Sequence, residues 1–405
     1  MKTVKFLKRI PNLRSIIASI ILIAISLIWY MRAVNILMEI VETLCLSKTE
    51  ILTFWTVNFI GTALSAMIGA KLSIDYCERQ KIITYWISFG IFSSLFLYVS
   101  SKELIYLTSG LLGASFGFGM PTSMAYYAGC TTPENRSKLG GFTFFIIAFC
   151  TFLFSVKTVD ILVNILLLII LRALSLMVFL INNFCGENVT IKQPPYSFVV
   201  SQRSFILYFL PWFMFCLVNY TTAPVMFKFF GKEFFSFLMT IEGVLIGTFA
   251  VLSGFVSDVF GRKRIVIIGF VMIGLGYAFL GVFPESQLAC FLYTVTDGIA
   301  WGMFHTIFVM TIWGDLAQNN PSEKFYAMGG IPYLLSHFLQ IVIGSYIAGT
   351  VSANSIFSFA SLFLFLAVVP LMFAPETLPE RVLRERELRS YVERAKRVRE
   401  KFTKS

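Results

Sequence analysis

The stretch that decides the fold reads Gly254-Phe-Val-Ser-Asp258-Val-Phe-Gly261-Arg262-Lys263-Arg264, and it separates two long apolar runs. An acid and three consecutive cations are too costly to place in lipid hydrocarbon. Glycine at position 261 permits a tight reversal of the chain. The stretch therefore predicts a short aqueous hairpin that joins two membrane-crossing helices.

The rest of the chain has the composition of a membrane protein. Of its 405 residues 57% are hydrophobic and only 14% are charged, which lies outside the range of soluble domains. A helical crossing needs about 20 mostly apolar residues, and short connections leave no room for a folded soluble domain. The twelve predicted spans are 15–38, 50–72, 82–100, 104–127, 139–156, 160–182, 204–226, 234–256, 265–283, 288–313, 325–348 and 354–374.

The cations are distributed unequally between the two sides of these spans. With a cytoplasmic N-terminus, 26 of the 33 Lys and Arg residues fall on the inner side, five fall in outer loops, and Arg32 and Arg172 fall within spans. This is the pattern of the positive-inside rule. We therefore expect a multi-pass protein of the cell membrane with both termini in the cytoplasm. The net charge of +11 reports orientation, so we expect no nucleic-acid partner.

Motifs for metal or nucleotide chemistry are absent from the sequence. The seven cysteines have no paired or metal-ligand spacing, and the two histidines are far apart. No Gly-x-x-x-x-Gly-Lys-Ser/Thr loop is present, which argues against ATP-driven pumping. We expect no cofactor, no metal and no enzymatic activity. The N-terminal apolar run is too long for a cleaved signal, so we expect a retained helix.

Landmarks recur between the two halves of the chain. Asp75 follows the second span as Asp258 follows the eighth, and Pro133-Glu-Asn-Arg136 precedes the fifth span as Pro321-Ser-Glu-Lys324 precedes the eleventh. Their order and nearly equal offsets indicate a duplicated six-helix unit. The predicted parts are an N-terminal bundle at 1–183, a cytoplasmic linker at 184–203, a C-terminal bundle at 204–374 and a basic amphipathic helix at 375–405.

The pattern Gly-x-x-x-Asp-x-x-Gly-Arg-Lys/Arg at 254–264 resembles the loop signature of the major facilitator superfamily, and the resemblance covers nearly the whole chain. It implies an all-α fold of twelve transmembrane helices in two pseudo-symmetric six-helix bundles. The loop at 69–81 keeps Asp75 and Arg79 but has Lys71 and Glu78 where the family has glycines. The ending Pro375-Glu376-Thr377 is similar to that of sugar-type members.

In the family, the loop of each half engages the other half at the cytoplasmic face. The resemblance implies that Asp258 faces the start of the fifth span near 137–140, and that Asp75 faces the start of the eleventh near Lys324. Such contacts hold an inner gate shut and break when the transporter opens inward. Asp315, near the inner end of the tenth span, is assigned to the same gate. The predicted gate residues are Asp75, Arg79, Arg136, Gly254, Asp258, Gly261, Arg262, Asp315 and Lys324.

An ionisable side chain inside a span is a functional candidate. Arg32, Asn35 and Glu39 share one face of the first span, which lines the central cavity in this superfamily. An arginine there could grip an anionic group through its planar fork. The alternative is an interfacial arginine that reaches outward beside Trp29 and Tyr30.

Glu242 in the eighth span and Asp297, Trp301 and His305 along one face of the tenth form a second polar set. A carboxylate in a low-dielectric site can hold a proton at neutral pH, so Glu242, Asp297 and His305 are candidates for proton coupling. A hydrogen-bonded network between helices is the alternative. The other predicted substrate contacts are Asn219, Tyr220, Trp301, His337 and Gln340.

Two features remain without an assigned role. Arg172 falls in the middle of the sixth span, and its partner is not evident from the sequence. The segment after 375 carries ten cations and keeps apolar 3-4-3-4 spacing, which favours contact with an anionic membrane surface.

These observations predict a monomeric secondary active transporter that moves a small solute by alternating access and is coupled to protons. A small organic anion is the favoured cargo because of Arg32. One alternative is a proton-antiport exporter of hydrophobic compounds of the drug-efflux type, which the aromatic content supports. Another is a membrane sensor or scaffold with a transporter fold. Small solutes, protons and membrane lipids are the expected partners.

Overall fold

The computed structural model describes residues 13–73, 76–98, 101–155, 160–181, 193–318, 320–378, 388 and 391–392, and these ranges contain helices and connections but no strand. The predicted basic helix at 375–405 therefore lies mostly outside the described residues, as does Asp75. The all-helical fold expected from the sequence is confirmed.

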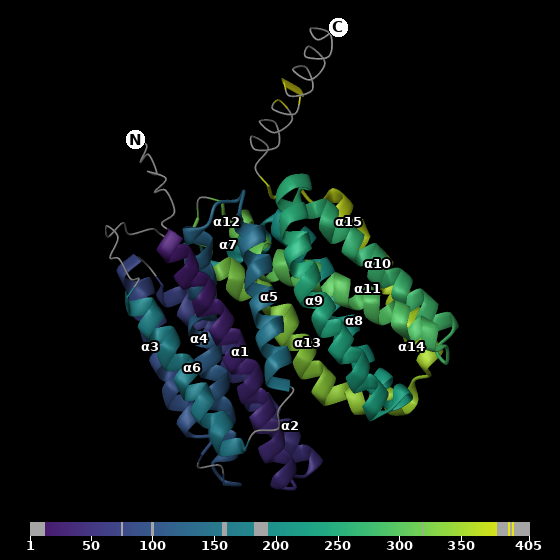
Figure 1. Cartoon of the computed structure of the whole chain (residues 1–405), viewed down its shortest axis with the longest axis horizontal. Helices are drawn as coiled ribbons and strands as arrows, with labels where there is room; N and C mark the ends of the chain where they lie inside the picture. Colours follow the sequence, from purple (N-terminus) through teal and green to yellow (C-terminus); the bar gives the residue numbers. More distant parts are fainter. Residues whose placement is uncertain are drawn as a thin grey trace.

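Six helices of the first half form one bundle, drawn in violet and blue in Figure 1. They are α1 (Leu13–Thr43), α2 (Lys48–Leu72), α3 (Tyr76–Leu95), α4 (Ile105–Cys130), α5 (Arg136–Ser155) and α6 (Ile161–Ile181). A short helix, α7 (Tyr196–Ser201), lies within the predicted linker, whose boundaries at 184–203 stay a prediction.

The second half forms the other bundle, in green and yellow. Two of its six rods are composite: the first changes from α to π and back to α helix, and the second is interrupted at Ala367. The elements are α8 (Arg203–Phe230), α9 (Lys232–Phe260), α10 (Arg262–Val282), α11 (Gln287–Phe304), η1 (His305–Thr311), α12 (Ile312–Ala317), α13 (Glu323–Thr350), α14 (Ala353–Leu366) and α15 (Val368–Phe373).

Ten of these twelve rods are long and apolar enough to cross a membrane. The other two, α3 and α4, belong to the same bundle; α3 begins with charged residues, and α4 is rich in glycine and serine. Large apolar side chains such as Leu64, Phe149 and Leu166 are more than half exposed. A surface of this kind suits lipid and would be a liability in water.

Local chemistry sets the helix ends. At the start of α2, Ser47 and Glu50 form a reciprocal capping box. Gly231 and Gly261 separate α8 from α9 and α9 from α10, and both have a positive φ that favours glycine. Most helices thus end within a few residues of the predicted span boundaries, since apolar runs and turn residues determine both.

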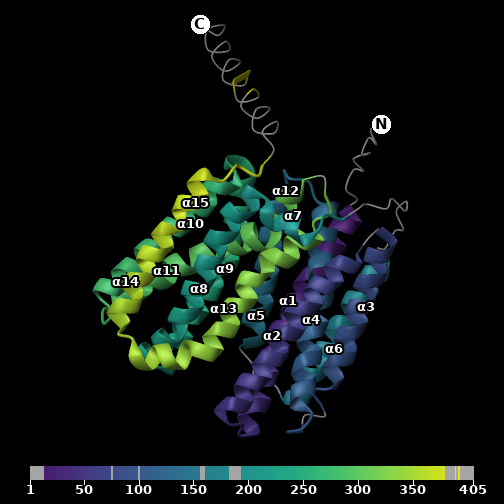
Figure 2. The ribbon, with the colours of Figure 1, turned by 180° about the vertical axis from the view of Figure 1, so that it is seen from behind.

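Contacts between the halves involve α2 with α13 and α5 with α9 and η1 (Figures 1 and 2). One end of the two bundles carries the ion pairs that join them. We call it the latch face and define it by residues 73, 79, 131–138, 193–202, 257–264, 312–324 and 374–378. It lies at the top of Figure 1, at the end of the molecule where α7 and α12 are labelled.

Candidate functional site

The second-half loop holds the two halves together through Asp258. This residue lies in the last turn of α9, and its Oδ2 accepts a hydrogen bond of 3.0 Å from the backbone N–H of Lys138 in the first turn of α5. The positive end of the helix dipole favours a carboxylate at that position. Arg262 Nη2 lies 2.9 Å from Asp258 Oδ1, and both side chains are fully buried. Asp258 therefore faces the helix start that the family resemblance implies.

Two glycines permit this approach. A Cβ on Gly254 would lie 2.5 Å from the carbonyl oxygen of Ser137 and 3.1 Å from Lys138 Cα, so any side chain there would push α9 away from α5. Gly261 has a φ of 97° at the reversal between α9 and α10. The loop thus needs glycine for close packing at one position and for backbone conformation at the other.

Asp315 of α12 lies at the centre of the latch face. Arg136 Nη1 from the first half donates to Asp315 Oδ1, and Arg262 Nε donates to Oδ2 at 3.2 Å. Thr377 Oγ1 donates to the same Oδ2 at 3.4 Å. Arg262 also donates to the carbonyl oxygen of Pro133 in the first half. Both carboxylate oxygens of Asp315 are therefore used by arginines.

The segment after α15 is tied into the same network by Glu376. Its Oε1 accepts from the backbone N–H of Arg262 at 2.9 Å, and its Oε2 accepts from that of Lys263 at 3.2 Å. These are free N–H groups at the start of α10, where a carboxylate is a favourable cap. The sequence reasoning noticed Pro375-Glu376-Thr377 only as a family feature and did not assign it to the gate.

The first-half loop reaches the second half through Arg79. Its Nε and Nη2 both donate to Glu323 Oε1, at 2.8 and 2.5 Å, and Ser73 Oγ donates to the same oxygen at 3.2 Å. Glu323 is fully buried, whereas the Arg79 side chain is 14% exposed. Glu323 is part of the quoted Pro321-Ser-Glu-Lys324 motif but was not among the predicted gate residues.

Lys324 contacts the linker. Its Nζ donates to the carbonyl oxygen of Pro194 at 2.8 Å and lies 5.1 Å from the ring centre of Tyr196. Tyr196 donates in turn to the carbonyl oxygen of Met67 in α2 at 2.6 Å, and burial raises the pKa of Tyr196 to about 12. The expected approach of Asp75 to Lys324 stays a prediction, because Asp75 is not described.

A buried polar cluster lies inside the second bundle around Asp297 of α11. Asn219 Nδ2 donates to its Oδ1 at 2.9 Å, and Tyr293 donates to its Oδ2 at 2.8 Å. Glu242 of α9 lies against the same part of α11, since a Cβ on Gly298 would lie 3.2 Å from the Glu242 carbonyl oxygen. Glu242 Oε2 is buried and has no hydrogen-bond partner among the described residues. No Lys or Arg of the described chain contacts either carboxylate.

His305 lies between the halves, at the start of the π-helical segment η1. Its ring stacks on Phe144 of α5, with centroids 4.5 Å apart and an interplanar angle of 3°, and it also packs on Trp301 at 4.8 Å. Its Nδ1 is buried without a hydrogen-bond partner among the described residues. Short π-helical segments occur frequently at functional sites, and this one was not foreseen from the sequence.

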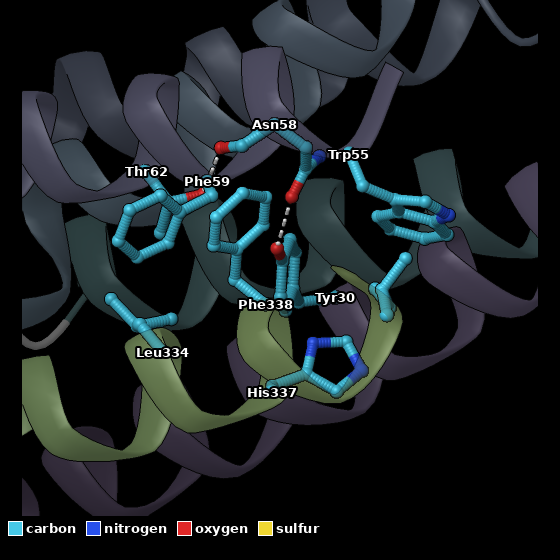
Figure 3. A pocket seen from close by; sticks show the side chains of 9 residues that line it. Tyr30, Trp55, Asn58, Phe59, Thr62, Leu334, His337 and Phe338 are labelled. Atoms are coloured by element: carbon cyan, nitrogen blue, oxygen red, sulfur yellow. Dashed lines mark hydrogen bonds between the residues drawn. The ribbon is translucent and has the colours of Figure 1, made fainter. Parts of the chain in front are cut away.

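A small, partly open pocket lies where α1 and α2 face α13 (Figure 3). Tyr30 donates to Asn58 Oδ1 at 2.9 Å, and Thr62 donates to the Asn58 carbonyl at 2.8 Å. Phe59 of α2 stacks on Phe338 of α13, with centroids 4.8 Å apart. The lining residues are Tyr30, Trp55, Asn58, Phe59, Thr62, Leu334, His337, Phe338 and Ile341.

Three of the predicted substrate contacts lie at or near this pocket. His337 lines it and contacts the ring of Trp55. Tyr220 packs on both His337 and Trp301, with centroids 5.5 and 6.4 Å apart. Gln340 is half-buried and has no hydrogen bond to a described residue. The sequence reasoning missed the lining from α2, although Asn58 within an apolar span was a visible signal.

Arg32 does not line the pocket. Its Nη2 donates to Asn164 Oδ1 of α6 at 2.6 Å, so the guanidinium lies against a neighbouring helix of its own bundle. Asn35 and Glu39 on the same face are exposed. Helix periodicity alone does not determine which neighbouring helix such a face meets.

Arg172 is buried in the first bundle between two tryptophans. Its guanidinium lies 4.1 Å from the ring centre of Trp29 and 4.7 Å from that of Trp86, and Nη1 donates to Ser26 Oγ at 2.8 Å. A Cβ on Gly90 would lie 2.6 Å from Arg172 Nε, so glycine makes room for it. Desolvated cation–π contacts of this kind are worth about 2 kcal/mol each. Arg172 thereby connects α1, α3 and α6.

Comparisons with known proteins agree on the fold. Solved structures similar to the chain include the human organic anion transporter MFSD10 (13% identity, TM-score 0.68, covering 88% of this chain and 99% of that one). The fucose:proton symporter FucP of E. coli is similar at 11% identity (TM-score 0.68, 89% and 99%). The proton:xylose symporter XylE is similar at 17% identity (TM-score 0.67, 90% and 96%).

Sequence comparisons match a smaller part of the chain than the structural comparisons do. No curated protein matches the chain. Residues 202–402 match the sequence model of the Major Facilitator Superfamily. Together with the twelve-helix fold, this match shows that the chain belongs to the major facilitator superfamily of membrane transporters.

Proposed function

We propose that the chain moves a small solute by alternating access of its two six-helix halves and couples that movement to protons. The observation that carries the proton coupling is the Glu242–Asp297 pair, two buried carboxylates without a cation among the described residues. Two unpaired negative charges in a low-dielectric bundle are costly, and a proton held by the pair removes that cost.

The surroundings of Asp297 support proton exchange. Tyr293 donates to Asp297 and lies 3.3 Å from the hydroxyl of Tyr277, which lies 2.7 Å from Thr222 Oγ1. This chain of hydroxyls crosses α8, α10 and α11. Asp297 also belongs to the same composite rod as Asp315 of the latch face, so a change at the carboxylate pair and a change at the latch act on one element.

The latch face acts as the inner gate in this proposal. The positive-inside distribution of Lys and Arg favours a cytoplasmic latch face and a location in the cell membrane. The ion pairs of Asp315 and Glu323 then hold the inner side shut in the conformation described here, and they must break for the protein to open inward.

A small organic anion was the favoured cargo from the sequence, because of Arg32. In the structure that guanidinium is engaged by Asn164, and the nearby pocket is largely aromatic. The lining therefore favours the second candidate, transport of a hydrophobic compound. The organic anion and sugar transporters with this fold are too distant to decide between cargoes.

The proton site can be tested without a known substrate. Infrared spectroscopy of the purified protein should detect a protonated carboxyl group at neutral pH that disappears in Asp297→Asn or Glu242→Gln. In liposomes, proton-driven uptake of a screened solute should fall at least tenfold in the same variants. Glu285→Gln, in an exposed position between α10 and α11, is the matched control.

Unchanged proton-driven uptake in both carboxylate variants would contradict the proposed coupling. The absence of flux for every solute, together with an intact infrared signal, would favour the sensor or scaffold alternative.

A further inference from the structure

The π-helical segment η1, at His305–Thr311, interrupts the rod that carries both Asp297 and Asp315. Its backbone hydrogen bonds span five residues, as in the bond from the N–H of Ile312 to the carbonyl of Ile307. A π-helix fits more residues into each turn than an α-helix does, and it is rare. Contacts with its surroundings must therefore stabilise this segment.

Side chains of the second half satisfy the wider turn. Thr311 Oγ1 donates at 2.8 Å to the carbonyl of Thr306, five residues back, whereas Thr143 in the regular helix α5 reaches only four residues back. Tyr326 of α13 donates at 2.7 Å to the carbonyl of Met310. In an uninterrupted α-helix that carbonyl would accept from the N–H four residues further on. A hydroxyl from a neighbouring helix thus bonds to the backbone where the π segment ends.

The first half also contacts this segment, through α5. Ser137 Oγ donates to Thr311 Oγ1 at 3.3 Å, and Phe144 stacks on the first residue of η1. Gly140 permits close packing, since a Cβ there would lie 2.9 Å from Met310 Cβ. All three contacts require α5 to lie against η1, as it does with the latch face closed. Movement of α5 away from η1 would remove them and favour the ordinary α-helix.

A change of η1 to α-helix would alter the direction of the side chains in α12. Successive residues of an α-helix are about 100° apart around its axis. Tightening the π turn by one residue would therefore rotate α12 by about 100° relative to α11. Gly314 would then take the direction in which Asp315 now points. Arg136 and Arg262 would lose the acceptor that they share.

From these contacts we propose that η1 is a switch of helix phase. It is π-helical while α5 lies against it and the latch face is closed, and it becomes α-helical as that face opens, which turns Asp315 away from both arginines. The contacts of α5 with η1 and the ion pairs of Asp315 then form and break together. This inference rests on the proposed function only in treating the opening of the latch face as a step of transport.

Spin labels within one half distinguish this switch from a rigid movement of the halves. Gln318 follows α12 and Arg264 lies in the first turn of α10, whereas Glu134 belongs to the first half, and all three are exposed. Double electron–electron resonance of the full-length, otherwise cysteine-free protein in detergent measures the 318–264 and 318–134 distances. Gly254→Ala, which pushes α9 away from α5, should produce a second population in both distances. A second population in 318–134 alone would overturn the proposal, because rigid halves leave 318–264 unchanged.

Tyr326→Phe tests the π segment directly. It removes the donor to the Met310 carbonyl and leaves every ion pair of the latch face in place. The second population of the 318–264 distance should rise about fivefold. Tyr346→Phe, at an exposed position further along α13, is the matched control and should change neither distance. An unchanged 318–264 distance in Tyr326→Phe would overturn the proposal.

Deletion of Val309, a half-buried residue within η1, should fix the switch in one phase. With one residue fewer, the segment can be α-helical while Asp315 still points toward both arginines. We expect this variant to show only the closed distances, and we expect Tyr326→Phe to add nothing in the shortened chain. An effect of Tyr326→Phe as large as in the full-length chain would contradict the switch. The point variants decide the proposal even if the shortened chain does not fold.

This proposal and the proposed coupling can fail separately, because the distances are measured without a proton gradient or a solute. Proton-driven flux with a 318–264 distance that never changes would contradict only the switch. A second population in that distance, without proton-driven flux, would contradict only the coupling.

Discussion

Arg79 and Arg262 follow equivalent helices of the two halves, yet they close the latch face in different ways. Arg79 pairs with Glu323, using one of its two carboxylate oxygens, while Oε2 has no partner among the described residues. Arg262 shares Asp315 with Arg136, and both oxygens of that carboxylate accept from arginines. Among the described residues, the first carboxylate thus accepts from one arginine through one oxygen, whereas the second accepts from two arginines through both oxygens and is buried.

The difference follows the sequence of the two loops. The second-half loop keeps the glycines at 254 and 261, so α9 can approach α5 and the reversal is tight. The first-half loop has Lys71 and Glu78 where the family has glycines, and its arginine remains 14% exposed. We therefore expect the second loop to contribute more than the first to the closure of this face. Each of the following variants alters the contacts made at the latch face by one of the two halves.

The largest effect is expected from Asp315→Asn. An amide must direct its NH₂ group toward Arg136 or Arg262, so one buried arginine loses its acceptor. Breaking a buried pair in this way costs about 3 kcal/mol, which is about a hundredfold in the ratio of open to closed latch. The measurement is the alkylation rate of a cysteine placed at the fully buried Ser137 in an otherwise cysteine-free chain.

Glu134→Gln is the matched control for this variant, because Glu134 is exposed in the same connection between α4 and α5. The control should leave the alkylation rate unchanged. If Asp315→Asn also leaves it unchanged, the network does not hold the latch face closed.

The second effect comes from Gly254→Ala, which tests packing instead of charge. The added Cβ would lie 2.5 Å from the Ser137 carbonyl oxygen and force α9 away from α5, at a cost of about 2 kcal/mol. Gly243→Ala is the control on the same helix, since a Cβ there meets nothing within 4 Å. Similar alkylation rates in the two variants would show that close helix approach is unimportant for closure.

Glu323→Gln should have a smaller effect, about 1 kcal/mol. The amide oxygen can still accept from Arg79 and Ser73, its NH₂ can occupy the position of the unpartnered Oε2, and partly exposed Arg79 keeps some hydration. The alkylation rate at position 137 should rise about fivefold. A rise as large as that of Asp315→Asn would contradict the distinction between Glu323, which accepts from an arginine through one oxygen, and Asp315, which accepts from arginines through both.

The sequence was sufficient to predict the helices, because apolar runs and glycine-bearing reversals are local features. The approach of Asp258 to the start of α5 was implied only by the family resemblance. It was not sufficient to predict which neighbour each polar face would meet. Arg32 was expected in a cavity, but the rotation of α1 directs it to Asn164 of α6. The roles of Glu323 and Glu376 at the latch face were also not predicted, because each depends on contacts with residues far away in the chain.

The pocket was missed for a related reason. Trp55 and Phe59 resemble lipid-facing or belt residues when α2 is read alone, and their role depends on the facing helix α13. Likewise, no local pattern in His305–Thr311 distinguishes π from α helix. Residues whose partners lie in the other half are therefore where sequence reasoning was weakest.

The smallest effect is expected from Lys324→Met, which removes the contact between α13 and the linker. Methionine keeps the apolar stem but loses the 2.8 Å hydrogen bond to Pro194 and the contact with the Tyr196 ring, at a net cost of about 0.5 kcal/mol. Alkylation at position 137 should rise only a few-fold. Lys71→Met removes an exposed cation from the end of α2, and an equal rise in this control would mean that general charge, and not the linker contact, is responsible.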